Sequence, residues 1–230
     1  MNILLVGASG GIGQALREQT ARRRPDATIL TAARSGADHA VDLTCEDSVS
    51  ELAEQLKGSV DRLHWVINAT GTLHGSDWQP EKQLKDIRQP SMSAVLAVNA
   101  IGPLLLARHL VPLLTHDEPA VFASLAARVG SISDNRRGGW YSYRMSKAAL
   151  VMGIRTLAIE CARRAPRLTC VALHPGTVAT PLSEPFQRNV PADQLFTPEQ
   201  SASHLLNVIE SLTPERSGNH LAWDGSEIPA

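Results

Sequence analysis

Short apolar runs alternate with longer segments of helical pattern along the whole chain. The apolar runs predict strands at residues 3–6, 28–33, 63–68, 120–125, 168–173 and 220–223. The longer segments predict helices at residues 11–24, 47–57, 91–114, 143–164 and 198–212. Pro25 and Pro166 end two of these helices, and Thr197 followed by Pro198 opens the last one.

Strands separated by helices imply βαβ units and a parallel sheet that is covered on both faces. We therefore expect an α/β fold with one doubly wound sheet, in one domain over residues 1–230. No internal repeat or linker interrupts the pattern. The least regular stretches are 72–90 and 181–195, and the second contains Pro181, Pro185 and Pro191. We interpret 181–198 as a substrate lid.

Composition and charge narrow the class of protein. The chain is 43% hydrophobic and 20% charged, with a formal net charge of −1. This balance gives no electrostatic reason to expect nucleic acid or an anionic membrane as a partner. No run of about 18 apolar residues is present, and the N-terminus lacks the basic start of a signal peptide. We therefore expect a cytoplasmic protein.

Cysteine and histidine patterns give no metal site. Cys45, Cys161 and Cys170 have no ligand spacing, and three scattered cysteines suit a reducing compartment. The eight histidines form no HExxH or paired-ligand pattern. We expect no bound metal.

A glycine-rich turn follows the first predicted strand and opens the first helix. Gly7, Gly11 and Gly13 have G-x-x-x-G-x-G spacing. Glycine permits a tight turn and lets backbone N–H groups approach a pyrophosphate at the positive end of a helix. The pattern predicts dinucleotide binding in a Rossmann-type fold. The alternative is a plain strand–helix turn.

The end of the second strand indicates which dinucleotide is preferred. An acidic residue at this place would bind a ribose 2′-hydroxyl, whereas an arginine accommodates a 2′-phosphate. Arg34 stands here, with no acid at the strand end. This favours NADP(H) over NAD(H), and Ser9 and Ser35 would add phosphate contacts. The alternative is that Arg34 is only an exposed turn residue.

Tyr143 and Lys147 are four residues apart, which places both side chains on one face of a helix. A fixed ammonium stabilises phenolate over phenol, so a tyrosine beside it becomes a better proton donor at neutral pH. Such a tyrosine could protonate a developing alkoxide or deprotonate an alcohol. Taken alone, the spacing is more often a surface contact.

Six motifs follow one another along the chain: Gly7-x-x-x-Gly11-x-Gly13, Asp42-Leu43, Asn68-Ala69-Thr70-Gly71, Val98-Asn99-Ala100, Tyr143-x-x-x-Lys147 and Pro175-Gly176-Thr177-Val178-Ala179-Thr180. Together and in this order they resemble the short-chain dehydrogenase/reductase family over essentially the whole chain. The third motif has one residue inserted relative to the family's N-A-G. The context around residues 130–143 is similar to the family's C-factor-like and sniffer-like branch, related to carbonyl reductases.

The resemblance implies a role for each matching residue. Tyr143 would be the general acid/base, and Lys147 would hold the nicotinamide ribose and lower the tyrosine pKa. Asn99 would hold a water that links Lys147 to solvent. The expected cofactor-binding residues are Gly7, Ser9, Gly10, Gly11, Ile12, Gly13, Arg34, Ser35, Asp42, Leu43, Asn68, Ala69, Thr70, Gly71, Tyr143, Lys147, Pro175, Gly176, Val178 and Thr180. In the alternative readings, Asn99 caps or kinks its helix and Thr180 caps the next segment.

One expected residue is missing. The family carries a serine just past the fifth strand, where it hydrogen-bonds the substrate oxygen, and Ala126-Ala127 stand at that place here. Loss of one such donor costs on the order of 10²–10³ in rate. Ser124 and Ser131 are the nearest substitutes, and we slightly prefer Ser131. The other alternative is that Tyr143 works without a serine.

Two functions of different class follow. The first is an NADP(H)-dependent oxidoreductase on a small carbonyl or alcohol substrate, whose identity segments 73–89, 131–140 and 181–195 would set. The second is an NADP(H)-binding regulatory or signalling protein with little turnover, which the two alanines motivate. The resemblance also implies a homodimer or homotetramer, assembled through the long helices 91–114 and 143–164.

Overall fold

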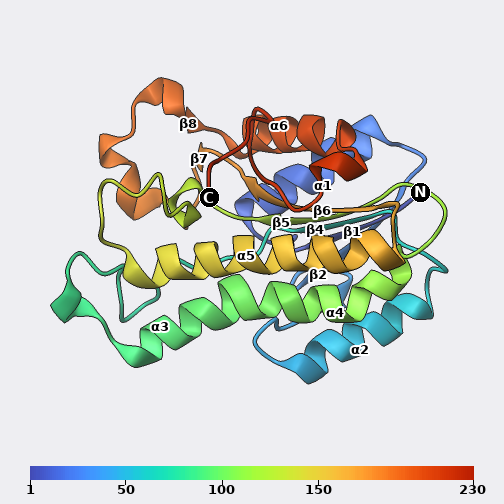
Figure 1. Cartoon of the computed structure of the whole chain (residues 1–230), viewed down its shortest axis with the longest axis horizontal. Coiled ribbons are helices and arrows are strands. Elements are labelled where there is room, and N and C mark those ends of the chain that lie inside the picture. The colour runs from blue at the N-terminus through green and yellow to red at the C-terminus, as the bar shows by residue number, and fades with distance from the viewer.

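A seven-stranded parallel sheet forms the centre of the molecule (Figure 1). The computed structural model describes the backbone of residues 1–230 and every side chain except that of Asn189. The strands lie in the order β3-β2-β1-β4-β5-β6-β9. Their bounds are Asn2–Val6 (β1), Thr28–Ala33 (β2), His39–Ala40 (β3), Trp65–Asn68 (β4), Ala120–Leu125 (β5), Leu168–His174 (β6) and His220–Ala222 (β9).

Helices cover both faces of this sheet (Figure 1). One face carries α1 (Gly11–Arg23) and α6 (Pro198–Glu210), which pack on each other. The other face carries α2 (Glu46–Lys57), α4 (Gly102–Leu114) and α5 (Tyr141–Arg164). Each face has its own core of buried apolar side chains, and strand residues alternate between the two cores: Leu4 and Val6 point to one, Ile3 and Leu5 to the other. The predicted doubly wound α/β fold is confirmed.

Several boundaries differ from the prediction. The helix predicted at 91–114 begins at Gln89 and consists of α3 (Gln89–Leu96), a π-helical turn (Ala97–Ile101) and α4. Helix α5 begins at Tyr141, two residues early. Strand β3 was not predicted, because two residues, one half-buried and one exposed, give no apolar run. Short 3-10 turns at η1 (Leu84–Asp86), η3 (Arg128–Gly130) and η6 (Pro214–Arg216) complete the connections.

The segment predicted as a lid is more regular than a loop. It contains the 3-10 turns η4 (Glu184–Asn189) and η5 (Ala192–Gln194) and the strand β8 (Leu195–Phe196). Strand β8 pairs in parallel with β7 (Thr177–Val178), outside the main sheet. The segment lies at the end of the molecule where α5 begins (Figure 1).

The continuous helix Gln89–Leu114 is long and apolar enough to cross a membrane by length and composition alone, with a mean hydropathy of 1.7 over an 18-residue window. The sequence pattern did not mark it. A core helix passes the same test, and the α4 part of this one packs Leu106, Leu110 and Leu114 into the core.

The strand order indicates which edge of the sheet binds a ligand. The order reverses between β1 and β4, and in open α/β sheets the crevice at such a point, beyond the carboxyl ends of the strands, receives ligands. Val6 of β1, Asn68 of β4 and Leu125 of β5 all stand at that edge.

One lysine is buried at this edge. Lys147 of α5 is only 3% exposed, and its Nζ donates a 2.7 Å hydrogen bond to the carbonyl of Leu125 at the end of β5. Burial penalises the charged form, so it lowers the pKa of Lys147 to about 8. The structure around α5 therefore contains a cation whose charge is unfavourable in the folded state.

This burial predicts a pH-dependent stability. An unfolded lysine titrates near ~10.4, so between about pH 8 and pH 10.5 the unfolded chain binds more protons and stability rises with pH. The stability of the wild type relative to Lys147→Met should increase by about 3 kcal/mol over that window, as measured by urea unfolding at both ends. Tyr143 also titrates at high pH but is shared by both proteins. A pH-independent difference would show that the ammonium is as stable in the folded state as in water.

Candidate active site

The glycine turn between β1 and α1 is packed too tightly for other residues. Gly7 has φ +82, in the left-handed region that favours glycine. A Cβ on Gly13 would lie 2.1 Å from the Gly7 carbonyl oxygen, and one on Gly11 would lie 2.9 Å from Thr180. The turn thus brings the backbone of β1, α1 and the loop after β6 together.

The start of α1 suits an anionic group. Gly10 is the N-cap and supplies no side-chain hydrogen bond, and the first turn contains no acidic residue. The first N–H groups of the helix therefore remain available at its positive end. Ser9 and Gly10 are exposed beside them, and Ile12 lines the large cavity described below. This cradle fits the pyrophosphate of a dinucleotide.

The predicted residues after β2 and β3 lie outside that cavity. Arg34 and Ser35 are exposed after β2, and the charge of Arg34 helps to lower the pKa of Asp42, after the larger effect of hydrogen bonds from Thr44. Asp42 Oδ1 accepts from the Thr44 backbone N–H at 2.9 Å and hydroxyl at 2.7 Å. Leu43 is buried against Gly102. Arg34 is thus free to meet a phosphate.

The turn after β4 uses its asparagine internally. Asn68 is fully buried, its amide donates to Ser124 Oγ at 3.0 Å, and its Oδ1 accepts from the N–H and hydroxyl of Thr70. Thr70 and Ala69 in turn lie against Gly7, where a Cβ would be 3.0 Å from them. Asn68 therefore shapes the adenosine side of the predicted site, while the backbone of Ala69 and Thr70 borders the glycine turn.

Asn99 lies in the π-helical turn between α3 and α4 and is buried. Its amide donates to the Thr72 carbonyl at 2.8 Å and to Ser146 Oγ at 3.0 Å, and its Oδ1 accepts from the Thr72 N–H at 2.8 Å. A Cβ on Gly71 would meet both Asn99 Oδ1, at 3.6 Å, and Lys147 Nζ, at 3.7 Å. Asn99 is thus near Lys147, and the water relay stays a prediction.

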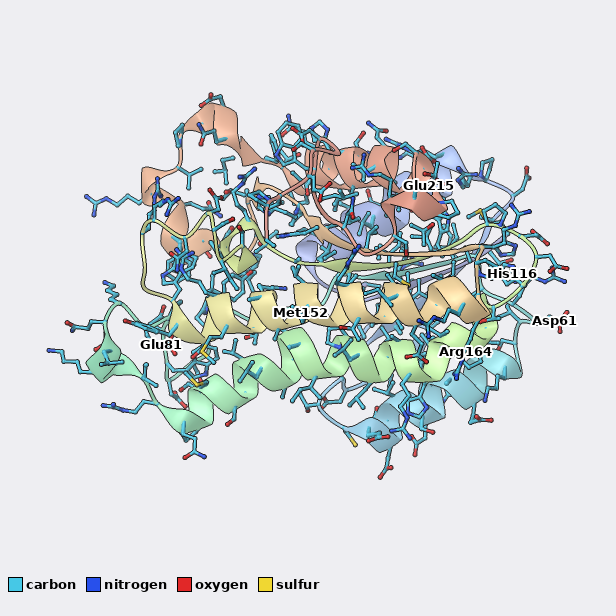
Figure 2. All side chains as sticks on the ribbon, viewed as in Figure 1. Asp61, Glu81, His116, Met152, Arg164 and Glu215 are labelled. Carbon is cyan, nitrogen blue, oxygen red and sulfur yellow. The ribbon has the colours of Figure 1, made fainter. Side chains whose placement is uncertain are left out.

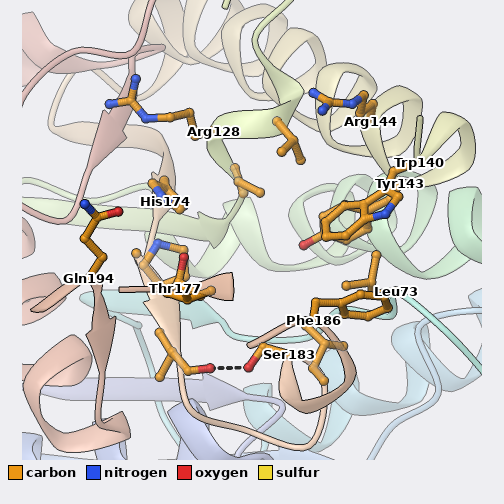
Figure 3. A pocket seen from close by; sticks show the side chains of 18 of the residues that line it. Leu73, Arg128, Trp140, Tyr143, Arg144, His174, Thr177, Ser183, Phe186 and Gln194 are labelled. Carbon is orange, nitrogen blue, oxygen red and sulfur yellow. Dashed lines mark hydrogen bonds between the residues drawn. The ribbon is translucent and has the colours of Figure 1, made fainter. Parts of the chain in front are cut away.

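Tyr143 directs its hydroxyl into a cavity of about 1130 Å³ (Figure 3). Lys147 Nζ lies 5.7 Å from the centre of the tyrosine ring. The expectation that Lys147 lowers the tyrosine pKa is wrong for the net shift, because burial raises the pKa of Tyr143 to about 12. Burial thus outweighs the effect of the Lys147 ammonium, which donates to Leu125 and whose own pKa is lowered by burial. Tyr143 is therefore a neutral phenol at physiological pH.

Neither of the two serines that the sequence offered replaces the missing donor. Ala126 and Ala127 both line the cavity, as the alignment of motifs predicted. Ser124 is fully buried and bonded to Asn68, and Ser131 is buried with its Oγ accepting from the Asp134 N–H at 3.1 Å. Neither serine lines the cavity. The preference for Ser131 is therefore not supported, and neither candidate serine stands beside Tyr143 in the cavity lining.

The loop after β6 and the lid form the opposite wall of the cavity (Figure 3). Pro175, Gly176, Val178 and Thr180 line it, and Gly176 has φ +82 with its Cα against the Phe196 ring. Ser183 donates to the Val178 and Thr180 carbonyls and so ties the lid to this loop. Further lid residues on the cavity are Leu182, Ser183, Pro185, Phe186, Arg188, Val190 and Gln194.

Aromatic rings gather at the cavity although the chain is only 4% aromatic. The Trp140 ring lies edge-on to Tyr143, with centroids 6.1 Å apart, and to Phe186 of the lid at 5.0 Å. The low aromatic content of the sequence did not predict this cluster of rings. The only local signal was Gly138-Gly139 before Trp140, which marks a turn.

Glu81 is a further residue that the sequence did not reveal. It is buried beside the N-terminal end of α5 (Figure 2), where its carboxylate accepts from the Ser142 N–H at 3.1 Å and from the Ser142 hydroxyl. Its carbonyl accepts from the Trp140 N–H. Trp140 has φ 52, a strained conformation for a bulky residue. Glu81 thus fixes the two residues that flank Tyr141 just before the catalytic candidate.

The described residues contain no group of three His, Cys, Asp or Glu side chains that could hold a metal ion. His174 lines the cavity with its Nδ1 unpartnered, and burial, helped by the charge of His220, lowers its pKa to about 3. It is therefore a neutral imidazole at physiological pH.

Known proteins resemble this chain over most of its length. A family model described as enoyl-(acyl carrier protein) reductase matches residues 10–223. The 1-hydroxy-2-glutathionyl-2-methyl-3-butene dehydrogenase of a Rhodococcus strain is 33% identical over 97% of both chains. The C-signal protein of Myxococcus xanthus is 34% identical over 64% of this chain and 82% of its own.

Among solved structures, an NADPH-bound carbonyl reductase from chicken fatty liver superposes with a TM-score of 0.85 at 23% identity, covering 100% of this chain and 98% of its own. That likeness shows a shared fold. The family match over residues 10–223 and the Rhodococcus relative cover the glycine turn, the Tyr143–Lys147 pair and the loop after β6. The chain therefore belongs to the short-chain dehydrogenase/reductase family of oxidoreductases.

Proposed function

We propose that this protein is an NADP(H)-dependent oxidoreductase that interconverts a carbonyl compound and an alcohol, with Tyr143 as general acid/base. The observation that carries the proposal is the position of Tyr143. Its hydroxyl points into a cavity whose wall also contains Ile12 of the dinucleotide turn and Val178 and Thr180 of the loop after β6. A bound cofactor and a substrate would therefore meet beside this hydroxyl.

When bound, NADP(H) supplies or accepts the hydride, and the chain supplies the proton. A neutral Tyr143 phenol donates its proton to the carbonyl oxygen as negative charge develops there, and takes it back in the oxidative direction. Lys147, with a pKa lowered to about 8, is largely protonated at neutral pH and stabilises the phenolate that remains. Val178 and Thr180 would orient the nicotinamide end, and the turn from Gly7 to Gly13 would hold the phosphates.

The Rhodococcus relative supports a carbonyl or alcohol substrate, because its name describes the oxidation of an alcohol and the two chains match over 97% of their lengths. Arg34 supports NADP(H) over NAD(H), since it is exposed and its described partners leave it free for a 2′-phosphate. The chicken carbonyl reductase, which has the same fold, binds NADPH.

The regulatory alternative rests on Ala126-Ala127 and on the C-signal relative. A protein of this kind would bind NADP(H) without turning over a carbonyl compound. The presence of Tyr143, Lys147 and Asn99 in one neighbourhood favours the enzyme, because a binding protein has no need of a proton donor aimed into its cavity.

The role of Tyr143 can be tested by substitution, with the other tyrosine of the chain as the control. In Tyr143→Phe, NADPH-dependent reduction of aldehydes, ketones and quinones should fall by about 10²–10⁴ while NADPH affinity changes little, because a general acid is lost. Tyr141→Phe changes the exposed tyrosine two residues before Tyr143 and should retain activity. Tight NADPH binding by the wild type with no turnover across the panel would instead favour the regulatory protein.

Arg34 decides the cofactor prediction. Arg34→Ala should weaken NADPH binding by about tenfold or more and leave NADH binding unchanged, because only NADPH carries the 2′-phosphate. The change is read from dissociation constants for both cofactors. Arg163→Ala, on the exposed last turn of α5, is the control for loss of one positive charge. Equal affinities for the two cofactors in the wild type would contradict the proposed preference.

We further propose that the protein forms a homodimer or homotetramer through α4 and α5. Exposed apolar side chains lie on these helices and the turn before α4, and Met152, midway along α5, is 66% exposed (Figure 2). The others are Ile101, Leu104, Met145 and Ile159. Such an uncovered row is typical of an interface.

A charge placed in this row should separate the copies. Met152→Glu is expected to shift the protein to monomer in sedimentation, because an unpaired carboxylate would be buried in the interface. Leu84→Glu changes an equally exposed apolar residue away from these helices and should leave the assembly intact. A wild-type protein that sediments as a monomer at all concentrations would rule out the assembly.

A further inference from the structure

Positive charge is concentrated around the cavity that contains Tyr143. The whole chain has 22 Lys and Arg and 23 Asp and Glu. The cavity lining has five arginines and one acidic residue, Asp134. The arginines are Arg128, Arg136, Arg137, Arg144 and Arg188. A nearly neutral protein has thus placed an unbalanced cluster of guanidinium groups where a substrate would bind.

Most of these arginines have no acidic partner. Arg128 forms an ion pair with Asp134 at 3.1 Å. Arg136, Arg137, Arg144 and Arg188 have none within 4.0 Å among the described side chains. Guanidinium groups crowded without counter-charge repel each other, and an anionic ligand would relieve that repulsion.

Arg144 is held ready for such a ligand. It is half-buried near the start of α5, directly after Tyr143. Its Nε donates to the carbonyls of Gly138 and Gly139 at 3.3 and 3.0 Å. Its two Nη groups make no hydrogen bond to described atoms. Burial, followed by the charge of Arg137, lowers the pKa of Arg144. Both arginines line the same cavity.

The backbone between Arg137 and Arg144 makes a left-handed turn. Gly138, Gly139 and Trp140 are consecutive residues with φ of 63, 66 and 52. Glycine adopts this region readily, whereas a bulky residue such as Trp140 persists there only where its surroundings enforce it, as is frequent at functional sites. Here Glu81 holds Trp140, and Arg144 holds the two glycines, so that the loop folds back toward the cavity.

The expected cofactor phosphates do not account for this cluster. The phosphate cradle is the turn after β1, and Arg34 follows β2. Arg128, Arg136 and Arg137 belong instead to the connection between β5 and α5, and Arg144 lies near the start of α5. Figure 3 shows Arg128 and Arg144 on the side of the cavity away from Ser183. Two cation sites on different loops indicate two separate anionic groups.

We propose that Arg137 and Arg144, flanked by Arg128 and Arg136, bind the carboxylate of an anionic carbonyl or alcohol substrate whose reacting carbon lies at Tyr143. This inference rests on the proposed oxidoreductase function and names its substrate class. A guanidinium fork binds a carboxylate through paired hydrogen bonds, and Arg144 presents its free Nη edge for that purpose. Trp140 and Phe186 would cover the apolar part of the substrate.

The test compares two aldehydes that share one ring and differ in charge and by one methyl group: 4-carboxybenzaldehyde and its methyl ester. The wild type should reduce the carboxylate with the higher kcat/KM. In Arg137→Gln and in Arg144→Gln, the ratio of carboxylate to ester kcat/KM should fall by about tenfold or more, because a charge-assisted hydrogen bond is lost. Arg163→Gln is the charge-matched control and should leave the ratio unchanged. A wild-type ratio at or below one, or a ratio unaffected by both variants, would overturn the proposal.

A binding measurement separates this inference from the proposed function. Dissociation constants of both aldehydes are measured calorimetrically with NADPH present. If neither aldehyde is reduced, yet the carboxylate binds more tightly than the ester and loses that advantage in Arg144→Gln, the anion site stands and the oxidoreductase proposal fails for these substrates. If both are reduced and bind equally, the oxidoreductase proposal stands and the anion site is wrong.

Discussion

The burial of Lys147 is the constraint around which this end of the molecule is built. Its Nζ donates to the last carbonyl of β5, which joins α5 to the sheet. Gly130 must be glycine, because a Cβ there would lie 2.8 Å from the Lys147 backbone. The turn after β5 is therefore shaped to fit this lysine. The proposed chemistry gives a reason for keeping a cation that destabilises the fold, because Lys147 stands one helical turn from Tyr143.

The polar side chains around this lysine mostly hold backbone rather than reach into the cavity. Asn99 bonds to both backbone groups of Thr72, Asn68 bonds to Thr70, and Glu81 binds the start of α5. Their hydrogen-bonding groups are largely used, so they position the site without contacting a substrate. Among the predicted catalytic residues, Tyr143 is the one that lines the cavity. Such a division is expected where a reacting group must be held rigidly by supporting hydrogen bonds.

Local patterns predicted the fold and the order of the motifs, whereas long-range contacts determined what the patterns missed. The apolar runs at 3–6 and 120–125 predicted strands correctly, because both faces of the sheet are covered and strand residues on both faces are apolar. Gly7 predicted a tight turn, because glycine is favoured at its left-handed φ. The hydrogen bond from Ser142 to Glu81 joins residues 61 positions apart, so no local sequence pattern predicts it. The tyrosine pKa was predicted in the wrong direction for a related reason: spacing gives the distance to the ammonium, but burial depends on the whole surrounding structure.

The arginine cluster and the two alanines belong to one physical account of the site. Ala126 and Ala127 remove a hydrogen-bond donor that would otherwise polarise the substrate oxygen, so less stabilisation is available at the reacting atom itself. Binding energy from a remote group can be used to fix the reacting carbon in place, and orientation alone contributes several kcal/mol, roughly 7–11 at its most favourable. In the proposed complex, a carboxylate held by Arg137 and Arg144 would supply that orientation from the residues that flank Tyr143. The rate lost with the missing serine then depends on the substrate. A neutral carbonyl compound loses the full stabilisation, whereas an anionic one is already aligned with the phenol when the proton moves.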